Sequence, residues 1–289
     1  MVVVQEVSAR IGRTTGRGLA GNIRQHGSAG LLRACVGLLL LANTVAIAAD
    51  LSAMADAVRL VVGGPRLAHV LVLAAFCILA QVFMHYTRYI AVLKWTTLSL
   101  LAYVATVLAI DVPWSQVGLS LVAWPVSLER DYLTMVVAIF GVALSPFIFF
   151  WQASQEAEDQ RVKPRREPLV EAPEQAPRAL ERIRLDTLVG MAVASLVGLS
   201  IMITVAATLH RQGVTEVVSS AQVAEALRPV AGQLAFAVFA AGIVGTGLLA
   251  IPVLAGSAAY AVGEALRWPV GLARPWRPKA STPPWRWRR

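Results

Sequence analysis

Long apolar blocks alternate with shorter polar segments along this chain. The clearest blocks cover residues 31–41, 68–83, 98–110 and 234–261, and they contain few charged side chains. A helix of about 20 mostly apolar residues is long enough to cross the hydrocarbon core of a bilayer. The pattern therefore predicts an all-α polytopic membrane protein.

Glycine, proline and charged residues separate the apolar blocks and predict where each span ends. The six predicted spans cover about residues 30–62, 67–84, 90–110, 131–152, 185–209 and 233–266. A shorter apolar run at 2–7 cannot span a membrane. Residues 153–184 are polar and predict a solvated connection. We expect residues 1–272 to form a single transmembrane domain.

Composition and charge agree with a chain that lipid surrounds. Hydrophobic residues make up 57% of the sequence, charged residues only 15%, and the mean hydropathy is +0.63. The net charge of +9 comes from basic residues in the loops of one side, which the positive-inside rule places in the cytoplasm. The N-terminal loop and the C terminus are therefore predicted to be cytoplasmic. Because this rule explains the basic residues, we expect no nucleic-acid partner.

A proline interrupts the fourth predicted span. Pro146 has no N–H, so the carbonyl of Val142 loses its helical partner, and Gly141 loosens the same turn. In lipid such a carbonyl must face protein, water or an ion. Transporters use helix interruptions of this kind to coordinate ions near the membrane midplane. A proline kink satisfied by neighbouring helices is the alternative that the residues alone leave open.

One carboxylic acid lies inside the first predicted span. Asp50 is surrounded by small apolar residues. Placing an ionisable group there costs roughly 2.5–3.5 kcal/mol on insertion scales, so such a residue is a candidate for an ion or proton pathway. A structural partner near the outer interface is the alternative.

The residues give little support to an enzyme. Ser145 has no histidine at a compatible depth, and no carboxylate pair occurs inside a span. Cys35 and Cys77 lie in apolar blocks and are interpreted as packing residues. We therefore expect neither enzymatic activity nor a bound cofactor.

Several segments resemble the Nramp family of divalent-metal transporters. Residues 145–159, SPFIFFWQASQEAED, are similar to the family's sixth helix, where metal importers carry Met-Pro-His and a magnesium-transporting branch carries a Ser- or Thr-Pro-aromatic version. Supporting segments are VVVQEVSARIGRTTGRGLAGNIR, LDTLVGMAVASLVGLSIMITVAATLH and GIVGTGLLAIPVLAGSAAYAV. The likeness runs from Val2 to about Leu272. It implies a partial LeuT-type inverted-repeat fold, with six full spans and an N-terminal helix remnant.

The resemblance also implies roles for individual residues. Val142 would offer its carbonyl to the metal, and Ser145 stands where metal importers have a methionine sulfur. Gln152 replaces a histidine of the family. Asp50 matches an acid used in proton movement, whose companion acid is replaced here by Ala53. Oxygen ligands in place of sulfur favour Mg²⁺ or Mn²⁺ over Fe²⁺.

Part of the family pattern is missing. No Asp-Pro-Gly motif, which carries the family's principal metal ligands, occurs in the chain. Residues 273–289 form a basic, Trp- and Pro-rich tail whose composition favours a shifted reading frame. A natural tail that touches anionic lipid is the alternative. We therefore expect a chain truncated at both ends.

The leading hypothesis is transport of a divalent cation, Mg²⁺ or Mn²⁺, across the plasma membrane by a fragment that does not suffice alone. Its expected partners are the lipid bilayer and the cation, and no protein partner is indicated. The alternative is a non-transporting membrane protein, or a pseudogene product, that packs with a partner.

Overall fold

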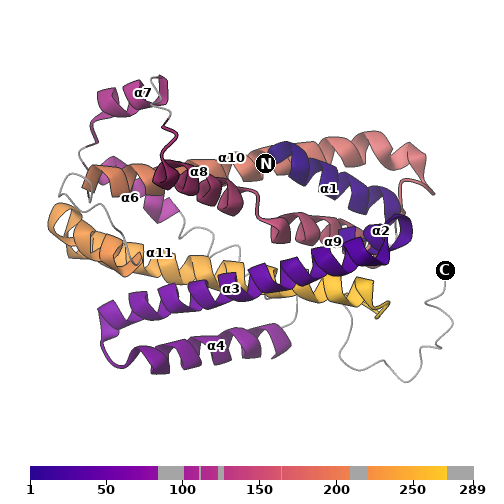
Figure 1. Cartoon of the computed structure of the whole chain (residues 1–289), viewed down its shortest axis with the longest axis horizontal. Coiled ribbons are helices and arrows are strands. Elements are labelled where there is room, and N and C mark those ends of the chain that lie inside the picture. Colours follow the sequence, from indigo (N-terminus) through magenta and orange to yellow (C-terminus); the bar gives the residue numbers. More distant parts are fainter. Residues whose placement is uncertain (84–100, 111, 123–126, 164, 209–219, 272–289) are drawn as a thin grey trace.

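Helices account for all secondary structure in the described part of the chain. The computed structural model describes residues 1–83, 101–110, 112–122, 127–163, 165–208 and 220–271. The helices are α1 (Val2–Thr15), α2 (Leu19–His26), α3 (Ala29–Val62), α4 (Arg66–Phe83), α6 (Leu101–Ala109), α7 (Trp114–Val122), α8 (Arg130–Ala143), α9 (Pro146–Val162), the 3-10 helix η2 (Pro173–Gln175), α10 (Ala176–Thr208) and α11 (Ser220–Ala265). The longest of them, α3, α10 and α11, extend along the same direction of the molecule (Figure 1).

Five segments of the described residues are long and apolar enough to cross a membrane. They are Ala29–Val62, Arg66–Phe83, Arg130–Val162, Pro173–Ala207 and Ala240–Ala265. These correspond to the first, second, fourth, fifth and sixth predicted spans, so an all-α polytopic architecture is confirmed. Of the third predicted span, at 90–110, only the part around α6 is described; residues 90–100 lie outside the described residues.

The first predicted span has clear end signals, and they act as expected. Ser28 precedes α3, and its hydroxyl accepts the N–H of Leu31 at 3.1 Å, which satisfies one of the helix's unpaired first donors. Gly63 follows α3 with a φ of 76°, a conformation that glycine adopts without a Cβ clash. The helix therefore begins and ends within a residue of the predicted bounds.

The predicted solvated connection at 153–184 is wrong over much of its length. Helix α9 continues to Val162, and α10 already begins at Ala176. Ala153, Ser154 and Glu156 are buried in α9 instead of facing water. The polar sequence was misleading because its charged side chains find partners on other helices, which no local pattern reveals. Helix α11 begins at Ser220, and its part that is apolar enough to cross a membrane, Ala240–Ala265, lies within the predicted span at 233–266.

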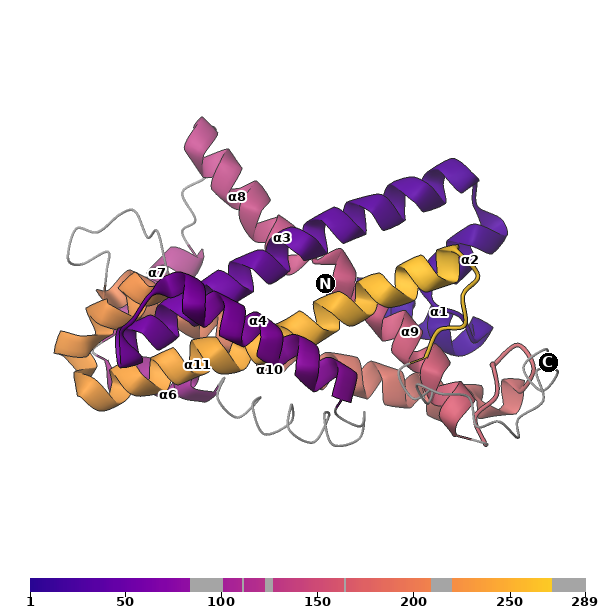
Figure 2. The same cartoon turned by 90° about the horizontal axis from the view of Figure 1, so that it is seen from below.

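Two groups of helices make up most of the packing. Helix α3 lies along α11 and α4 packs mainly on α3, whereas α1 lies along α9 and α10. Figures 1 and 2 show α2 at the turn between α1 and α3, close to the C-terminal end of α11. A shared apolar cluster joins the groups there, and its buried members are Ala20, Leu32, Val36, Leu39, Phe150 and Ala261.

Candidate functional site: the break between α8 and α9

The fourth membrane segment consists of two helices with a break between them. Helix α8 ends at Ala143, and the N–H of Leu144 donates to the carbonyl of Phe140 at 2.8 Å. Ser145 has the non-helical φ and ψ of −57° and 114°, and Pro146 is the first residue of α9. Proline favours this first position because it needs no N–H there. The structure therefore places a helix end and a helix start in the middle of one apolar segment.

The break leaves backbone oxygens directed away from a regular helix. A helix end normally has unpaired carbonyls, and Pro146 can donate nothing to the carbonyl of Val142. The carbonyl of Ser145 accepts the N–H of Ile148 at 3.2 Å, so it is already used by the first turn of α9. The carbonyl of Val142 is one of the backbone oxygens in the last turn of α8, and its role as a ligand stays a prediction.

Helix α8 is largely uncovered by the rest of the described chain. Val137 is 70% exposed and Phe140 is 62% exposed. A Cβ atom added at Gly141 would meet nothing within 4 Å. Figure 2 shows α8 extending away from α3 and α11, whereas α9 returns toward them. The break is therefore approachable from the side of α8, and half-buried Ser145 stands at its edge.

Gln152 and Asp50 do not belong to the break itself. Gln152 is half-buried in α9, well past Ser145, and Asp50 is half-buried in α3. Helices α3 and α9 meet through Leu39 and Phe150. Asp50 lies eleven residues beyond Leu39, about 16 Å along the helix at ~1.5 Å per residue. The structure brings Val142, Ser145 and Pro146 together, with Gln152 and Asp50 more distant.

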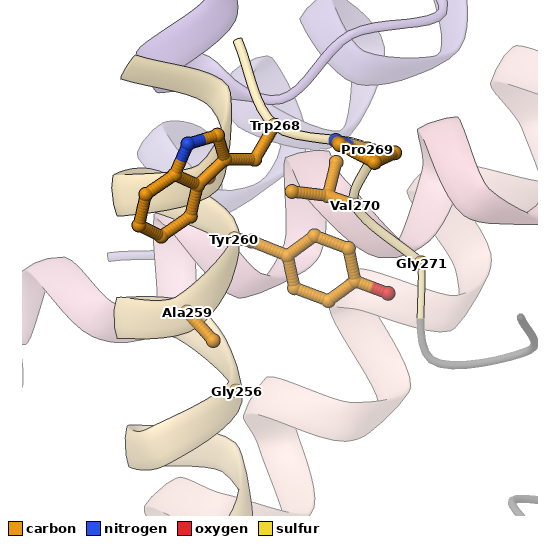
Figure 3. A pocket seen from close by; sticks show the side chains of 8 residues that line it. Gly256, Ala259, Tyr260, Trp268, Pro269, Val270 and Gly271 are labelled. Carbon is orange, nitrogen blue, oxygen red and sulfur yellow. The ribbon is translucent and has the colours of Figure 1, made fainter. Parts of the chain in front are cut away.

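Helix α9 is anchored firmly below the break. The rings of Trp151 and Tyr260 meet edge to face, with centroids 6.1 Å apart. A Cβ at Gly256 would overlap the Trp151 ring, so the close approach of α9 to α11 requires glycine there. Beside this contact, Tyr260, Trp268 and Val270 surround a cavity of about 240 Å³ at the end of α11 (Figure 3). The residues that line this cavity all belong to α11 and the segment that follows it, and none of them is a residue of the break.

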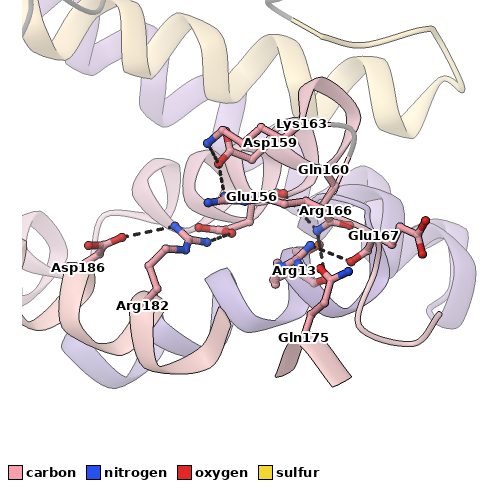
Figure 4. A network of polar contacts seen from close by, with 11 residues as sticks. Arg13, Glu156, Asp159, Gln160, Lys163, Arg166, Glu167, Gln175, Arg182 and Asp186 are labelled. Atoms are coloured by element: carbon pink, nitrogen blue, oxygen red, sulfur yellow. Dashed lines mark hydrogen bonds and ion pairs between the residues drawn. The ribbon is translucent and has the colours of Figure 1, made fainter. Parts of the chain in front are cut away.

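Buried polar residues at the other end of α9 are a feature that the sequence analysis missed. Glu156 accepts a hydrogen bond from the Arg182 guanidinium at 2.6 Å. Arg13, only 2% exposed, donates to the carbonyl of Glu167 and to Gln175 Oε1, both at 2.8 Å. Figure 4 shows the Glu156–Arg182 pair, which joins α9 to α10, and the contacts of Arg13 of α1 with Glu167 and Gln175 in the segment before α10.

The buried guanidinium of Arg13 lies near acidic side chains of α9. Burial lowers the pKa of the Arg13 guanidinium, and nearby Glu156 partly opposes that shift. An arginine nevertheless stays protonated near neutral pH. The spacing of Glu156, Asp159 and Lys163 along one helix face was the available sequence signal, but it fits a solvated surface equally well.

A buried polar contact joins α3 to α11, as the polar residue Asn43 inside an apolar span leads one to expect. The Asn43 amide donates to the carbonyl of Leu254 and to the hydroxyl of Ser257, both at 2.8 Å. Asn43 is 3% exposed, and such an interhelical bond replaces a costly unpaired amide in lipid. Near the C-terminal end of α3, Asp56 forms an ion pair of 2.8 Å with Arg66, the first residue of α4. Both contacts fix α3, which carries Asp50, against its neighbours.

A site made from charged metal ligands is not found in the described part of the chain. No group of three or more His, Cys, Asp or Glu residues with suitable placement occurs among the residues the structure describes. Carbonyl and hydroxyl oxygens suit hard cations, which also keep some of their water ligands.

Comparison with known proteins gives one family. The family described as Natural resistance-associated macrophage protein-like, Nramp, matches residues 1–283. A divalent metal cation transporter MntH of Aeromonas hydrophila is 27% identical over 258 residues, which are 86% of this chain and 58% of the relative. A protein of the same name from Ralstonia nicotianae is 28% identical, over 80% of this chain and 51% of its own length. The chain thus spans between half and three fifths of these relatives.

Proposed function

The chain belongs to the Nramp family, and from this premise we propose that it takes part in moving divalent metal cations across a membrane. The relatives named as divalent metal cation transporters support this proposal, since each matches at least four fifths of the chain. The break between α8 and α9 would form one wall of the cation's site. Five apolar segments of membrane-spanning length provide the setting that such transport requires.

The proposal depends most on the Val142 carbonyl. Pro146 begins α9 and cannot donate to that oxygen, so the oxygen needs a partner from outside the helix. Within a membrane an unpaired carbonyl costs several kcal/mol, and a bound cation would remove that cost. The hydroxyl of Ser145 follows directly and would supply a second oxygen ligand.

The ligand chemistry favours Mg²⁺ or Mn²⁺ as the transported ion. The donor atoms at the break are a carbonyl and a hydroxyl oxygen, with no sulfur beside them. Softer transition metals prefer thioether or imidazole ligands, whereas Mg²⁺ prefers oxygen and keeps several waters. Gln152 would add an amide oxygen to the polar lining, and Gly141 would let the chain bend near the ion.

We further propose the family's LeuT-type arrangement, with six spans in one domain over residues 1–272, in a plasma membrane. The N-terminal loop and the C terminus would be cytoplasmic, because the loops on that side carry most of the Lys and Arg residues. The end of α11 that carries Glu264 would then face the cytoplasm as well. Residues 273–289 lie outside the described residues.

A second candidate function is suggested by the exposure of α8. Four of its apolar residues, Met135, Val137, Ile139 and Phe140, are more than half exposed. A membrane protein that does not transport could use this surface to pack against a partner in the bilayer. Transport and packing are not exclusive, so the two candidates must be separated by measuring cation flux.

Asp50 provides the test of flux. The purified chain is reconstituted in liposomes that contain a dye responding to Mn²⁺, and uptake is followed after Mn²⁺ is added outside. Asp50→Asn removes the buried charge while keeping the size, and we expect uptake to fall about tenfold, equivalent to ~1.4 kcal/mol of lost cation or proton stabilisation.

Asp56→Asn is the matched control. Asp56 lies on the same helix, but it pairs with Arg66 near the C-terminal end of that helix. We expect uptake by this variant to stay within about twofold of the original chain, because exposed ion pairs contribute little. Absence of Mn²⁺ uptake by the original chain would favour the packing function, and equal uptake by the two variants would remove Asp50 from the pathway.

A further inference from the structure

Helix α2 begins without any capping side chain of its own. Gly18 stands at the N-cap position and Gly21 at the third helical position. Helices usually place Ser, Thr, Asp or Asn at the first of these and often Glu at the second, because the first turn has unpaired N–H groups. A helix of eight residues with glycine at both positions should be a weak one.

A carboxylate from the other end of the chain supplies what α2 lacks. Glu264 Oε1 accepts the N–H of Gly18 at 2.8 Å, and Oε2 accepts the N–H of Gly21 at 2.9 Å. These are the two N–H donors that a capping box satisfies. The Glu264 carboxylate therefore replaces both side chains of such a box, the one at the N-cap and the one at the third helical position. Its negative charge also faces the positive end of the helix dipole.

The two glycines fit this arrangement sterically. A Cβ added at Gly18 would lie 2.6 Å from Glu264 Oε2 and 2.5 Å from the Ser154 hydroxyl. At Gly21 the added Cβ would lie 3.3 Å from the same carboxylate oxygen. Glu264 is 8% exposed, and Ser154 is buried beside it on α9. The start of α2 is therefore shaped to admit this carboxylate, with α9 closing the third side.

The contact lies where the two helix groups meet. The connection α2 joins α1, which packs on α9, to α3, which packs on α11. The Arg24 guanidinium adds a second tie by donating to the backbone carbonyl of Glu264. Because α2 connects the two groups of helices, its contact with Glu264 limits how far α1 and α9 can move away from α3 and α11.

We propose that Glu264 is a positioning residue that holds α2 against α11, beside Ser154 of α9, and so keeps the predicted cytoplasmic side of the protein closed. The structural part of this statement stands by itself, and the closing role rests on the proposed function. Transport proteins with broken helices alternate by moving one group of helices against another. Release of this junction would be one step of such a movement.

Hydrogen exchange of the reconstituted chain tests the structural part without any transport. In Glu264→Ala both N–H groups lose their acceptor, so we expect exchange across residues 18–26 to speed up about tenfold or more by local opening. Glu264→Gln keeps the size and one acceptor oxygen, and should give an intermediate increase. Gly18→Ala displaces the carboxylate and should match Glu264→Ala, with no further increase when the two are combined.

Glu181→Gln is the control, because Glu181 is an exposed carboxylate near the start of α10. Its exchange pattern should equal that of the original chain. Unchanged exchange at 18–26 in Glu264→Ala would overturn the proposal, and so would an equal increase over α2 and over the middle of α3, because the effect would then be general.

Mn²⁺ uptake by the same variants separates the closing role from the capping role. The described hydrogen bonds of the Glu264 carboxylate go to the start of α2 and not to the proposed cation ligands Val142 and Ser145. Glu264→Gln should therefore change the maximum rate about fivefold and leave the half-saturating concentration within about twofold. An altered half-saturating concentration at an unchanged maximum rate would overturn the closing role. If the original chain takes up no Mn²⁺, the proposed function fails and the closing role fails with it, while the exchange result still decides whether Glu264 caps α2.

Discussion

Replacing Gly12 by alanine is expected to lower the stability of the chain by about 2 kcal/mol, despite the better helix propensity of alanine. Gly12 lies in α1 where the backbone of α9 passes directly over it. An added Cβ would overlap the carbonyl oxygen of Ala153 and lie 2.8 Å from its Cα. Because backbone atoms cannot rotate away as a side chain can, α1 and α9 must separate.

Gly190 is the matched control for this substitution. It also lies within a helix, but an added Cβ would meet nothing within 4 Å. Gly190→Ala should therefore be neutral or stabilise by up to about 1 kcal/mol through helix propensity. Both variants are compared by reversible unfolding in detergent micelles. Equal shifts in their unfolding midpoints would show that α1 and α9 do not pack as closely as described.

Replacing Glu156 by alanine is expected to be the most harmful change among the charged residues, with a loss of about 2–3 kcal/mol of folding stability. The Glu156 side chain is 8% exposed and binds Arg182, whose side chain is 32% exposed. Removing one member of a buried pair costs roughly 3–5 kcal/mol, and the partial exposure of Arg182 reduces that figure. The guanidiniums of Arg13 and Arg182 repel each other and would then lose the Glu156 charge between them, with only Asp159 still acting on both.

Lys163→Ala is the control for the charge effect. Lys163 pairs with Asp159 at 2.7 Å, but half of the lysine side chain is exposed. An exposed pair contributes about 0–1 kcal/mol, so this variant should unfold close to the original chain. Glu156→Gln keeps an acceptor oxygen for Arg182. Its folding stability should therefore lie between those of Glu156→Ala and Lys163→Ala. A Glu156→Ala variant as stable as Lys163→Ala would mean that the buried network adds nothing to the fold.

The membrane-spanning helices could be predicted from the sequence because lipid imposes a simple rule. A span needs a long apolar run. The runs that form α3 and α4 are separated clearly, because α3 ends before Gly63 and α4 begins at Arg66. Helix extent beyond the lipid could not be predicted in the same way. The polar end of α9 is helical and buried because Glu156 meets Arg182, a contact between residues that hydropathy treats as equally solvated.

The helix break could also be predicted, since proline removes a donor wherever it stands. Pro146 alone locates the end of α8 to within a few residues. The capping role of Glu264 could not be predicted, because its partners Gly18 and Gly21 are far away in sequence. Two glycines at the start of a short helix were nevertheless a usable signal, since they marked a helix that needed its cap from elsewhere.

Cation titration of the reconstituted chain tests the central claim most directly, namely that a divalent cation replaces the partner that Pro146 denies to the Val142 carbonyl. Mn²⁺ or Mg²⁺ is titrated calorimetrically into the original chain, Pro146→Ala, Ser145→Ala and the control Pro173→Ala, which alters a proline at the start of η2. Pro146→Ala restores an N–H that competes for the carbonyl, and Ser145→Ala removes a ligand oxygen. Each should weaken binding about tenfold, or ~1.4 kcal/mol, with the control unchanged. Binding of equal strength in all four proteins, or no binding to the original chain, would contradict the account.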